Sequence, residues 1–129
     1  MTSGLFINGE WRSGTGESKV TNPATGETVD IVQTGDTGDA KRAVDAAHSA
    51  FPKWAALTAE ERSDYLYKLY EKMMERQNEL ARLMTEEQGK PLHESQGEIA
   101  YAASFLKWYA EEAKRVYGET IPAASPSKR

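Results

Sequence analysis

The side chains that most often carry chemistry are few in this sequence, and they do not converge. The chain has two histidines, His48 and His93, and no cysteine. The lack of cysteine excludes thiol nucleophiles, thiolate zinc sites, iron–sulfur clusters and disulfides from these 129 residues. A metal site needs several His, Asp or Glu at ligand spacing, which the pair His93-Glu94 does not provide alone. We therefore predict that both histidines are solvated surface residues.

The acidic pairs and the glycines form no catalytic pattern. Glu60-Glu61, Glu86-Glu87 and Glu111-Glu112 are neighbours in sequence, and neighbours on a helix point in different directions instead of meeting on one substrate. The run Gly35-Asp36-Thr37-Gly38 lacks the spacing of a dinucleotide or phosphate loop. No serine lies in a G-x-S-x-G turn. The residues alone predict no catalytic and no cofactor-binding residue in this chain.

Aromatic side chains are the remaining candidates for a binding surface. A surface that stacks nucleic-acid bases interleaves aromatic residues with Lys and Arg. The aromatic residues of this sequence are not interleaved in that way, so we predict that they pack in the core. The net charge of −4, from 16 basic and 20 acidic residues, also argues against nucleic-acid or anionic-membrane partners. The residues concerned are Tyr65, Tyr67, Tyr70, Tyr101, Phe105, Trp108 and Tyr109.

Residues 1–38 are predicted to form strands and turns. Asn8-Gly9 supplies the positive φ angles of a type I′ hairpin turn between two apolar-containing triplets. The composition of the rest predicts a loop over 13–18, a short strand Lys19-Val20-Thr21, a turn over Asn22–Gly26 and a strand over Thr28–Thr34.

Residues 39–118 are helical in pattern. In the first helix an apolar stripe at spacings of three or four consists of Ala40, Val44, Ala47, Phe51 and Trp54. Pro52 should kink or stop this helix near its end.

Thr58 followed by Glu61 predicts a capping box at the start of a second helix. Gln77-Asn78 divides this helix in two if Asn78 acts as a new cap, and Gly89 before Pro91 ends it. Its apolar stripe is Leu66, Leu69, Met73, Leu80 and Leu83 or Met84.

A third helix over 93–117 is apolar around more than half of its circumference. Its predicted inner face is Ile99, Ala103, Leu106, Ala110, Ala113 and Tyr117, flanked by Tyr101, Phe105, Trp108 and Tyr109. Such a helix needs cover on two sides, and the first two helices are expected to supply one of them. Leu, Ile, Val and Phe total 20 of the 129 residues, a share below the ~20% that indicates disorder when the net charge is high. Because the net charge here is only −4, an ordered segment with a small core is the better interpretation. We expect a segment that completes its core against something else.

The whole chain, 1–129, is expected to be a single segment of mostly helical α+β class. A β-hairpin and strands precede three to four helices, and residues 119–129 form a proline-containing connector. No apolar run approaches the ~18 residues of a membrane span, and Met1-Thr2-Ser3-Gly4 lacks the features of a signal peptide. We expect a soluble, cytoplasmic protein without a membrane partner.

Six stretches of the sequence match a known family: Phe6–Trp11, Thr21–Glu27, Ala46–Trp54, Leu83–Leu92 with its Gly-Lys-Pro loop, Gly97–Leu106 and Tyr117–Pro122. On these stretches the chain resembles the aldehyde dehydrogenase superfamily, and succinate-semialdehyde dehydrogenases in particular. The resemblance covers the chain without a gap, but members of that family are several times longer.

This resemblance implies a partial cofactor-binding domain of an aldehyde dehydrogenase α/β fold. The parent enzyme would use NAD or NADP to oxidise succinate semialdehyde to succinate, through a cysteine thiolate and a glutamate-activated water. This chain has no cysteine, so it is expected to be inactive and without cofactor by itself. Its expected partners are the rest of the dehydrogenase chain and further copies, as a homo-oligomer or by self-association of the fragment.

The resemblance also implies two minor sites. Tyr101 and Phe105 match positions that line the substrate tunnel in relatives, although ordinary helix packing is the simpler interpretation. The backbone carbonyls of Val20 and Thr21, with the Glu87 carboxylate, match a site for a monovalent cation. Glu87 stands where the family has a shorter Asp, which puts the reach of that carboxylate in question.

A competing hypothesis is a stand-alone, non-catalytic helical interaction module, a remnant whose wide apolar helix docks on a partner. A free module should end in a capped and charged surface, whereas this sequence ends in a connector that follows an under-covered helix. That difference favours the dehydrogenase segment. A small intact enzyme that uses Glu or His is the weakest alternative, because no constellation of such residues converges.

Overall fold

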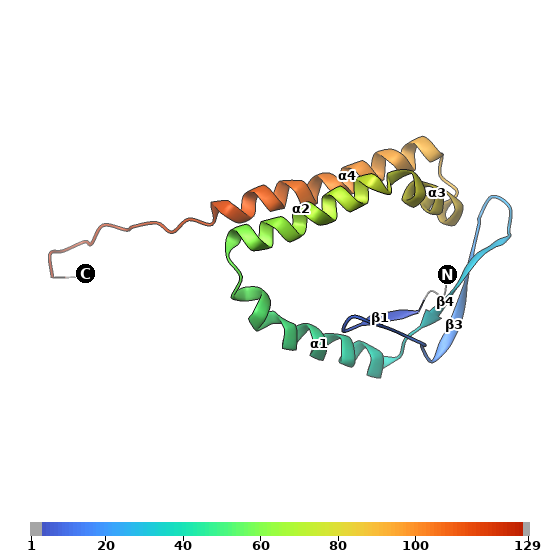
Figure 1. Cartoon of the computed structure of the whole chain (residues 1–129), viewed down its shortest axis with the longest axis horizontal. Coiled ribbons are helices and arrows are strands. Elements are labelled where there is room, and N and C mark those ends of the chain that lie inside the picture. Colours follow the sequence, from blue (N-terminus) through green and yellow to red (C-terminus); the bar gives the residue numbers. More distant parts are fainter. Residues whose placement is uncertain (1–3, 128–129) are drawn as a thin grey trace.

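The computed structural model describes residues 4–127, which form two small antiparallel sheets and four helices (Figure 1). The first sheet pairs β1 (Leu5–Ile7) with β2 (Glu10–Arg12). Asn8 and Gly9 take φ angles of 55° and 82°, as a type I′ turn requires. The predicted hairpin is confirmed, and so is the mostly helical α+β class.

The second sheet is a two-stranded ribbon of β3 (Gly16–Thr21) and β4 (Thr28–Thr34). Its turn is the predicted Asn22–Gly26 segment, in which the Asn22 side chain accepts a hydrogen bond from the Ala24 N–H at 2.9 Å. The loop predicted over 13–18 is wrong for residues 16–18. They pair across to the far end of β4, a long-range contact that local composition does not reveal.

Helix α1 (Thr37–Ala55) begins two residues before the predicted start. Asp36 and Asp39 form a reciprocal capping box, in which each carboxylate accepts the other residue's backbone N–H at 2.9 and 3.0 Å. Pro52 lies in the last turn, and the helix ends three residues later, in agreement with the predicted stop.

Helices α2 (Ala59–Glu75) and α3 (Gln77–Gln88) follow, and the Thr58–Glu61 capping box is present as predicted. The predicted division of this region is also confirmed, but it falls at Arg76. Asn78 is not the cap that we predicted; its side chain accepts a hydrogen bond from Gln96 instead. Gly89 ends α3 with a φ of 74°, the left-handed conformation that favours glycine at this position.

Helix α4 (Leu92–Glu112) passes into a short 3-10 turn, η1 (Ala113–Arg115). The helix therefore ends before the predicted residue 117. Tyr117 lies outside it and is 79% exposed, so its predicted place on the inner face is wrong. Of the predicted connector, residues 119–127 extend away from the helices (Figure 1), and residues 128 and 129 lie outside the described part.

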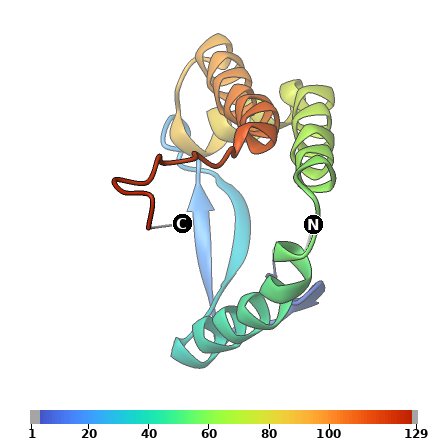
Figure 2. The same cartoon turned by 90° about the vertical axis from the view of Figure 1, so that its left-hand side faces the viewer.

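Helices α2, α3 and α4 pack together as a bundle (Figure 2), and most of its buried side chains are small. Small side chains let helix backbones approach closely, so the bundle closes with few large apolar groups inside it. Of the predicted α4 face, Leu106 and Ala113 are half-buried. The buried residues of the bundle are Ser63, Ala81, Ser95, Ile99, Ala103 and Ala110.

Helix α1 lies apart from this bundle, at the other end of the β3–β4 ribbon (Figures 1 and 2). Its main contact with another element is with β1, and the whole predicted stripe of α1 is exposed. The expectation that the first helix covers α4 is therefore wrong. Periodicity identifies the apolar side of a helix, but it does not say which element covers that side.

Candidate functional site

The most prominent surface feature is an aromatic face on α4, which we define as Tyr101, Phe105, Trp108 and Tyr109. These side chains are between 45% and 66% exposed, because α2 and α3 cover only the small-residue side of the helix. The predicted core packing of the aromatics is thus wrong for this face, and Tyr65 and Tyr67 on α2 are exposed as well.

Tyr101 and Phe105, the predicted tunnel residues, lie one helical turn apart within the aromatic face. Their ring centroids are 4.9 Å apart and the rings meet edge to face at 81°, a favourable geometry for an aromatic pair. The pair offers a largely apolar wall, in which the Tyr101 hydroxyl is the polar group.

Val20 and Thr21 lie at the end of β3, and Glu87 lies exposed in the last turn of α3. These two elements contact each other. The predicted cation ligands therefore come from neighbouring segments. The strand pairing also shifts its register between Val20 and Thr21, so hydrogen bonding is irregular there. Within residues 4–127 no group of three or more His, Cys, Asp or Glu could hold a metal ion.

Polar contacts fix the start of α4 against α3, and sequence reasoning did not identify them. The buried Ser95 hydroxyl is 2.9 Å from the Thr85 hydroxyl. The Gln77 side chain donates to the Gln96 carbonyl at 2.9 Å. Lys90 of the Gly-Lys-Pro loop forms an ion pair with Glu98. These contacts determine the direction in which the aromatic face points.

The charged groups with shifted pKa values stabilise helix ends. The backbone N–H of Thr58, and then its hydroxyl, hold the pKa of Glu61 below its usual range. The backbone N–H of Asp36, and then the Arg42 guanidinium, lower the pKa of Asp39. The hydrogen bond from Lys114 to Glu60, at 2.8 Å, raises the pKa of that lysine. These shifts stabilise the charged forms, so they mark structural contacts and provide no poised general acid or base.

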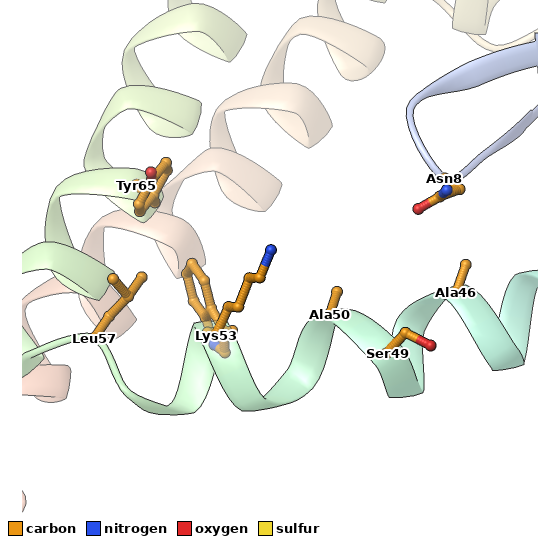
Figure 3. A pocket seen from close by; sticks show the side chains of 8 residues that line it. Asn8, Ala46, Ser49, Ala50, Lys53, Leu57 and Tyr65 are labelled. Atoms are coloured by element: carbon orange, nitrogen blue, oxygen red, sulfur yellow. The ribbon is translucent and has the colours of Figure 1, made fainter.

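An open cleft of about 580 Å³ lies between the first hairpin, α1 and the start of α2 (Figure 3). Sequence reasoning did not predict it, because its walls come from three separate elements. Only the apolar stripe that includes Trp54 pointed toward this region. The lining residues are Asn8, Ala46, Ser49, Ala50, Lys53, Trp54, Leu57 and Tyr65.

No helix within the described residues is long and apolar enough to cross a membrane. Both histidines are exposed, as predicted. Among residues 4–127 the aromatic face and the cleft are exposed surfaces, and the sequence contains no cysteine.

The sequence of this chain is similar to those of several known enzymes. The chain is 58% identical over 126 residues to glutarate-semialdehyde dehydrogenase of Pseudomonas putida, and 53% identical over 126 residues to succinate-semialdehyde dehydrogenase [NADP(+)] GabD of Escherichia coli. Each match covers 96% of this chain and 26% of the relative. The chain therefore spans about a quarter of the length of these relatives.

The structural comparison agrees with the sequence match. A crystal structure described as an E. coli NADP dependent enzyme superposes with a TM-score of 0.94 at 49% identity, covering 97% of this chain and 26% of that one. The family model described as "Aldehyde dehydrogenase family" matches residues 11–129. The resemblance seen in the sequence is thereby confirmed, and the chain belongs to the aldehyde dehydrogenase family.

Proposed function

We propose that this chain is the N-terminal segment of an NAD(P)-dependent aldehyde dehydrogenase that oxidises a carboxylate-bearing semialdehyde. Succinate semialdehyde, oxidised to succinate, is the first candidate substrate. The observation that carries the proposal is the identity of 52–58% to glutarate- and succinate-semialdehyde dehydrogenases over 96% of the chain. Because those relatives differ in substrate, we extend the proposal to four- and five-carbon semialdehydes.

In this proposal the segment shapes the enzyme and leaves the chemistry to other residues. A bound NAD or NADP would accept the hydride, and a cysteine outside these 129 residues would attack the aldehyde. The role of this chain is to present Tyr101 and Phe105 as an apolar wall of the substrate path. The isolated chain is inactive and binds no nicotinamide cofactor.

The end of β3 and the end of α3 form a candidate site for a monovalent cation in the same proposal. The backbone oxygens of Val20 and Thr21, together with one carboxylate from Glu87, are the oxygen donors that a hard cation prefers. The contact between the two elements and the irregular pairing at Val20 support this assignment. Such a cation would brace the ribbon against the bundle.

The exposed aromatic face also supports self-association of the isolated chain, and the longer enzyme is proposed to be a homo-oligomer. Scattering should give a mass above 14.3 kDa for the isolated chain, rising with concentration. The double variant Trp108→Ser/Tyr109→Ser should lower it toward the monomer. A monomer at millimolar concentration for the parent sequence would contradict this part of the proposal.

The first experiment is the mass of the native protein in its source cells, detected with an antibody to residues 93–117. A species several times heavier than 14.3 kDa supports the dehydrogenase proposal. A species of 14.3 kDa contradicts it and favours the alternative, a non-catalytic interaction module.

The second experiment measures oxidation by the longer chain with NAD and with NADP. Succinate and glutarate semialdehydes should give a higher kcat/KM than a neutral aldehyde of equal length. Tyr101→Ala and Phe105→Ala should raise KM more than kcat falls, because the pair positions substrate. Tyr67→Ala, an exposed aromatic on α2, is the matched control and should change neither constant. Equal kcat/KM for the neutral aldehyde would contradict the proposed substrate class.

A further inference from the structure

The cleft of Figure 3 combines an apolar floor with a single charged group. Ala46 and Ala50 form its floor along α1, and the rings of Trp54 and Tyr65 close one end, with their centroids 5.6 Å apart. Figure 3 shows the Lys53 side chain rising from α1 into the opening, while Asn8 faces the opening from the hairpin turn. Within the described residues 4–127, no Asp or Glu lines the cleft.

The charge in this cleft has no counterpart in the part of the chain that the structure describes. Lys53 forms no ion pair within residues 4–127, in contrast to Lys41 on the same helix, which contacts Asp45 at 2.6 Å. A second cation, Lys68, lies 5.8 Å from the centroid of the Tyr65 ring. The cleft is thus locally positive in a chain with a net charge of −4, which favours an anionic occupant.

The position of the cleft also indicates a structural need for an occupant. It lies where α1 meets α2, and the main element contact of α1 is with β1. The direct connection between the end of α1 and the start of α2 therefore depends on the short segment 56–58 and on the Trp54–Tyr65 ring contact. An occupant that touched the hairpin, α1 and α2 together would fix the angle between the two helices.

We propose that this cleft is the seat of a polypeptide segment from outside residues 1–129 of a longer chain, which lays an apolar side chain on the floor and a carboxylate against Lys53. The inference rests on the proposed function in so far as it requires that longer chain. The relatives provide one: about three quarters of their length lies outside the matched region. The volume of about 580 Å³ lies within the ~300–1,000 Å³ of typical binding sites.

The test uses 2-naphthoate, a flat apolar body with one carboxylate, as a probe on the 15N-labelled isolated chain. We expect saturable shifts of the NMR signals from the residues that line the cleft. Lys53→Gln should weaken binding about fivefold, as expected for the loss of a partly exposed ion pair, and Lys53→Arg should restore it. Lys41→Gln removes the same charge outside the cleft and should leave the affinity unchanged. Neutral 2-naphthamide should bind about as weakly as the probe binds Lys53→Gln.

A second titration, by calorimetry on the longer chain, identifies the occupant. If a segment of that chain fills the cleft, 2-naphthoate should no longer bind there, and wild type and Lys53→Gln should behave alike. Binding to the longer chain at the affinity of the isolated chain would overturn the proposal and show a cleft open to small molecules. No saturable shifts in the isolated chain, or equal affinity for Lys53→Gln, would overturn the assigned chemistry. Semialdehyde oxidation is measured separately, so a filled cleft in an inactive enzyme would contradict only the proposed function.

Discussion

The bundle and α1 both carry apolar side chains at helical spacing, yet they pack in opposite ways. In the bundle, Ala81, Ser95 and Ala103 are completely buried. On α1, Val44 and Phe51 are more than 60% exposed. The two regions are joined by one short loop and belong to the same family segment. The difference in burial therefore depends on which elements pack against each helix.

In the bundle, the sides on which the helices meet carry mostly small buried residues. The small-residue side of α4 lets α2 and α3 approach, whereas the aromatic face of the same helix stays uncovered. On α1 the small residues Ala46, Ser49 and Ala50 line the open cleft, so small size alone does not bring that helix against a neighbour. We infer that the bundle is the more tightly packed region of the isolated chain, whereas α1 is held there mainly by its contact with β1 and by the Trp54–Tyr65 ring contact.

The largest expected effect comes from enlarging a buried position of the bundle. Ala103→Leu inserts a bulky side chain at a completely buried site of α4 and should lower the free energy of unfolding by about 1–3 kcal/mol. Urea unfolding followed by circular dichroism measures it. Ala47→Leu, an exposed site on α1, is the control and should stay within about 0.5 kcal/mol of the parent. Equal losses at both positions would break the distinction between the regions.

Removal of the cap at the joint between the regions should have an intermediate effect. Thr58→Ala deletes the hydroxyl that accepts the Glu61 N–H at 3.2 Å and should cost about 1 kcal/mol of unfolding free energy. Thr37→Ala, at the exposed start of α1, should cost less than half as much. The same unfolding curves report both variants, and a neutral Thr58→Ala would show that α2 does not need its capping box.

Acid should weaken both capping boxes, beginning with the one at Glu61. The pKa of Glu61 is lowered below its ordinary value of 4.5, so the unfolded chain binds more protons in the window between the lowered pKa and 4.5. The stabilising contribution is complete above about pH 4.5 and is lost as the pH falls through the lowered pKa. Glu61→Gln should flatten this part of the pH dependence of global unfolding.

The corresponding change on α1 tests whether that helix unfolds separately. The pKa of Asp39 is lowered from 3.8, so its contribution is likewise lost on acidification below that value. Asp39→Asn should alter hydrogen exchange at the start of α1 and leave the global unfolding curve unchanged. A parallel change in both measurements would mean that α1 and the bundle unfold together.

The smallest change in stability is expected for a substitution on α1, and its size should differ between the isolated chain and the longer one. Phe51→Ser should change the stability of the isolated chain by less than about 0.5 kcal/mol, because Phe51 is 63% exposed. In the longer chain the same substitution should destabilise by several times more if another segment covers α1. Thermal unfolding of both chains, with and without the substitution, measures the ratio, and equal small effects in both would show that α1 remains uncovered.

Features encoded by neighbouring residues were predicted well from the sequence. The Asn8-Gly9 turn, the Thr58–Glu61 box and the Gly89 helix end depend on backbone conformations that a few side chains specify locally. The Asp36–Asp39 capping box was not predicted although its spacing is present in the sequence. Its N3 residue, Asp39, is Asp in place of the usual Glu or Gln.

Features that depend on distant partners were not predictable in the same way. Residues 16–18 are a strand only because β4 pairs with them. The aromatic face is exposed because the cover for that side of α4 does not come from α1. The cleft around Lys53 requires three elements to meet, and no single stretch of sequence carries that information.

Gly89 lies close to the turn of the β3–β4 ribbon, so the ribbon links the end of α3 to the start of α1. A Cβ atom at Gly89 would lie 2.8 Å from Pro23 Cγ, so the bundle bears on the ribbon at its turn, while the other end of the ribbon leads into α1 (Figure 1). A ribbon of seven residues is about 23 Å long. If the ribbon tilted by about 10° about its turn, the start of α1 would therefore move by about 4 Å. A side chain at position 89 would thus displace α1 by pushing on the ribbon turn, although residue 89 does not contact α1.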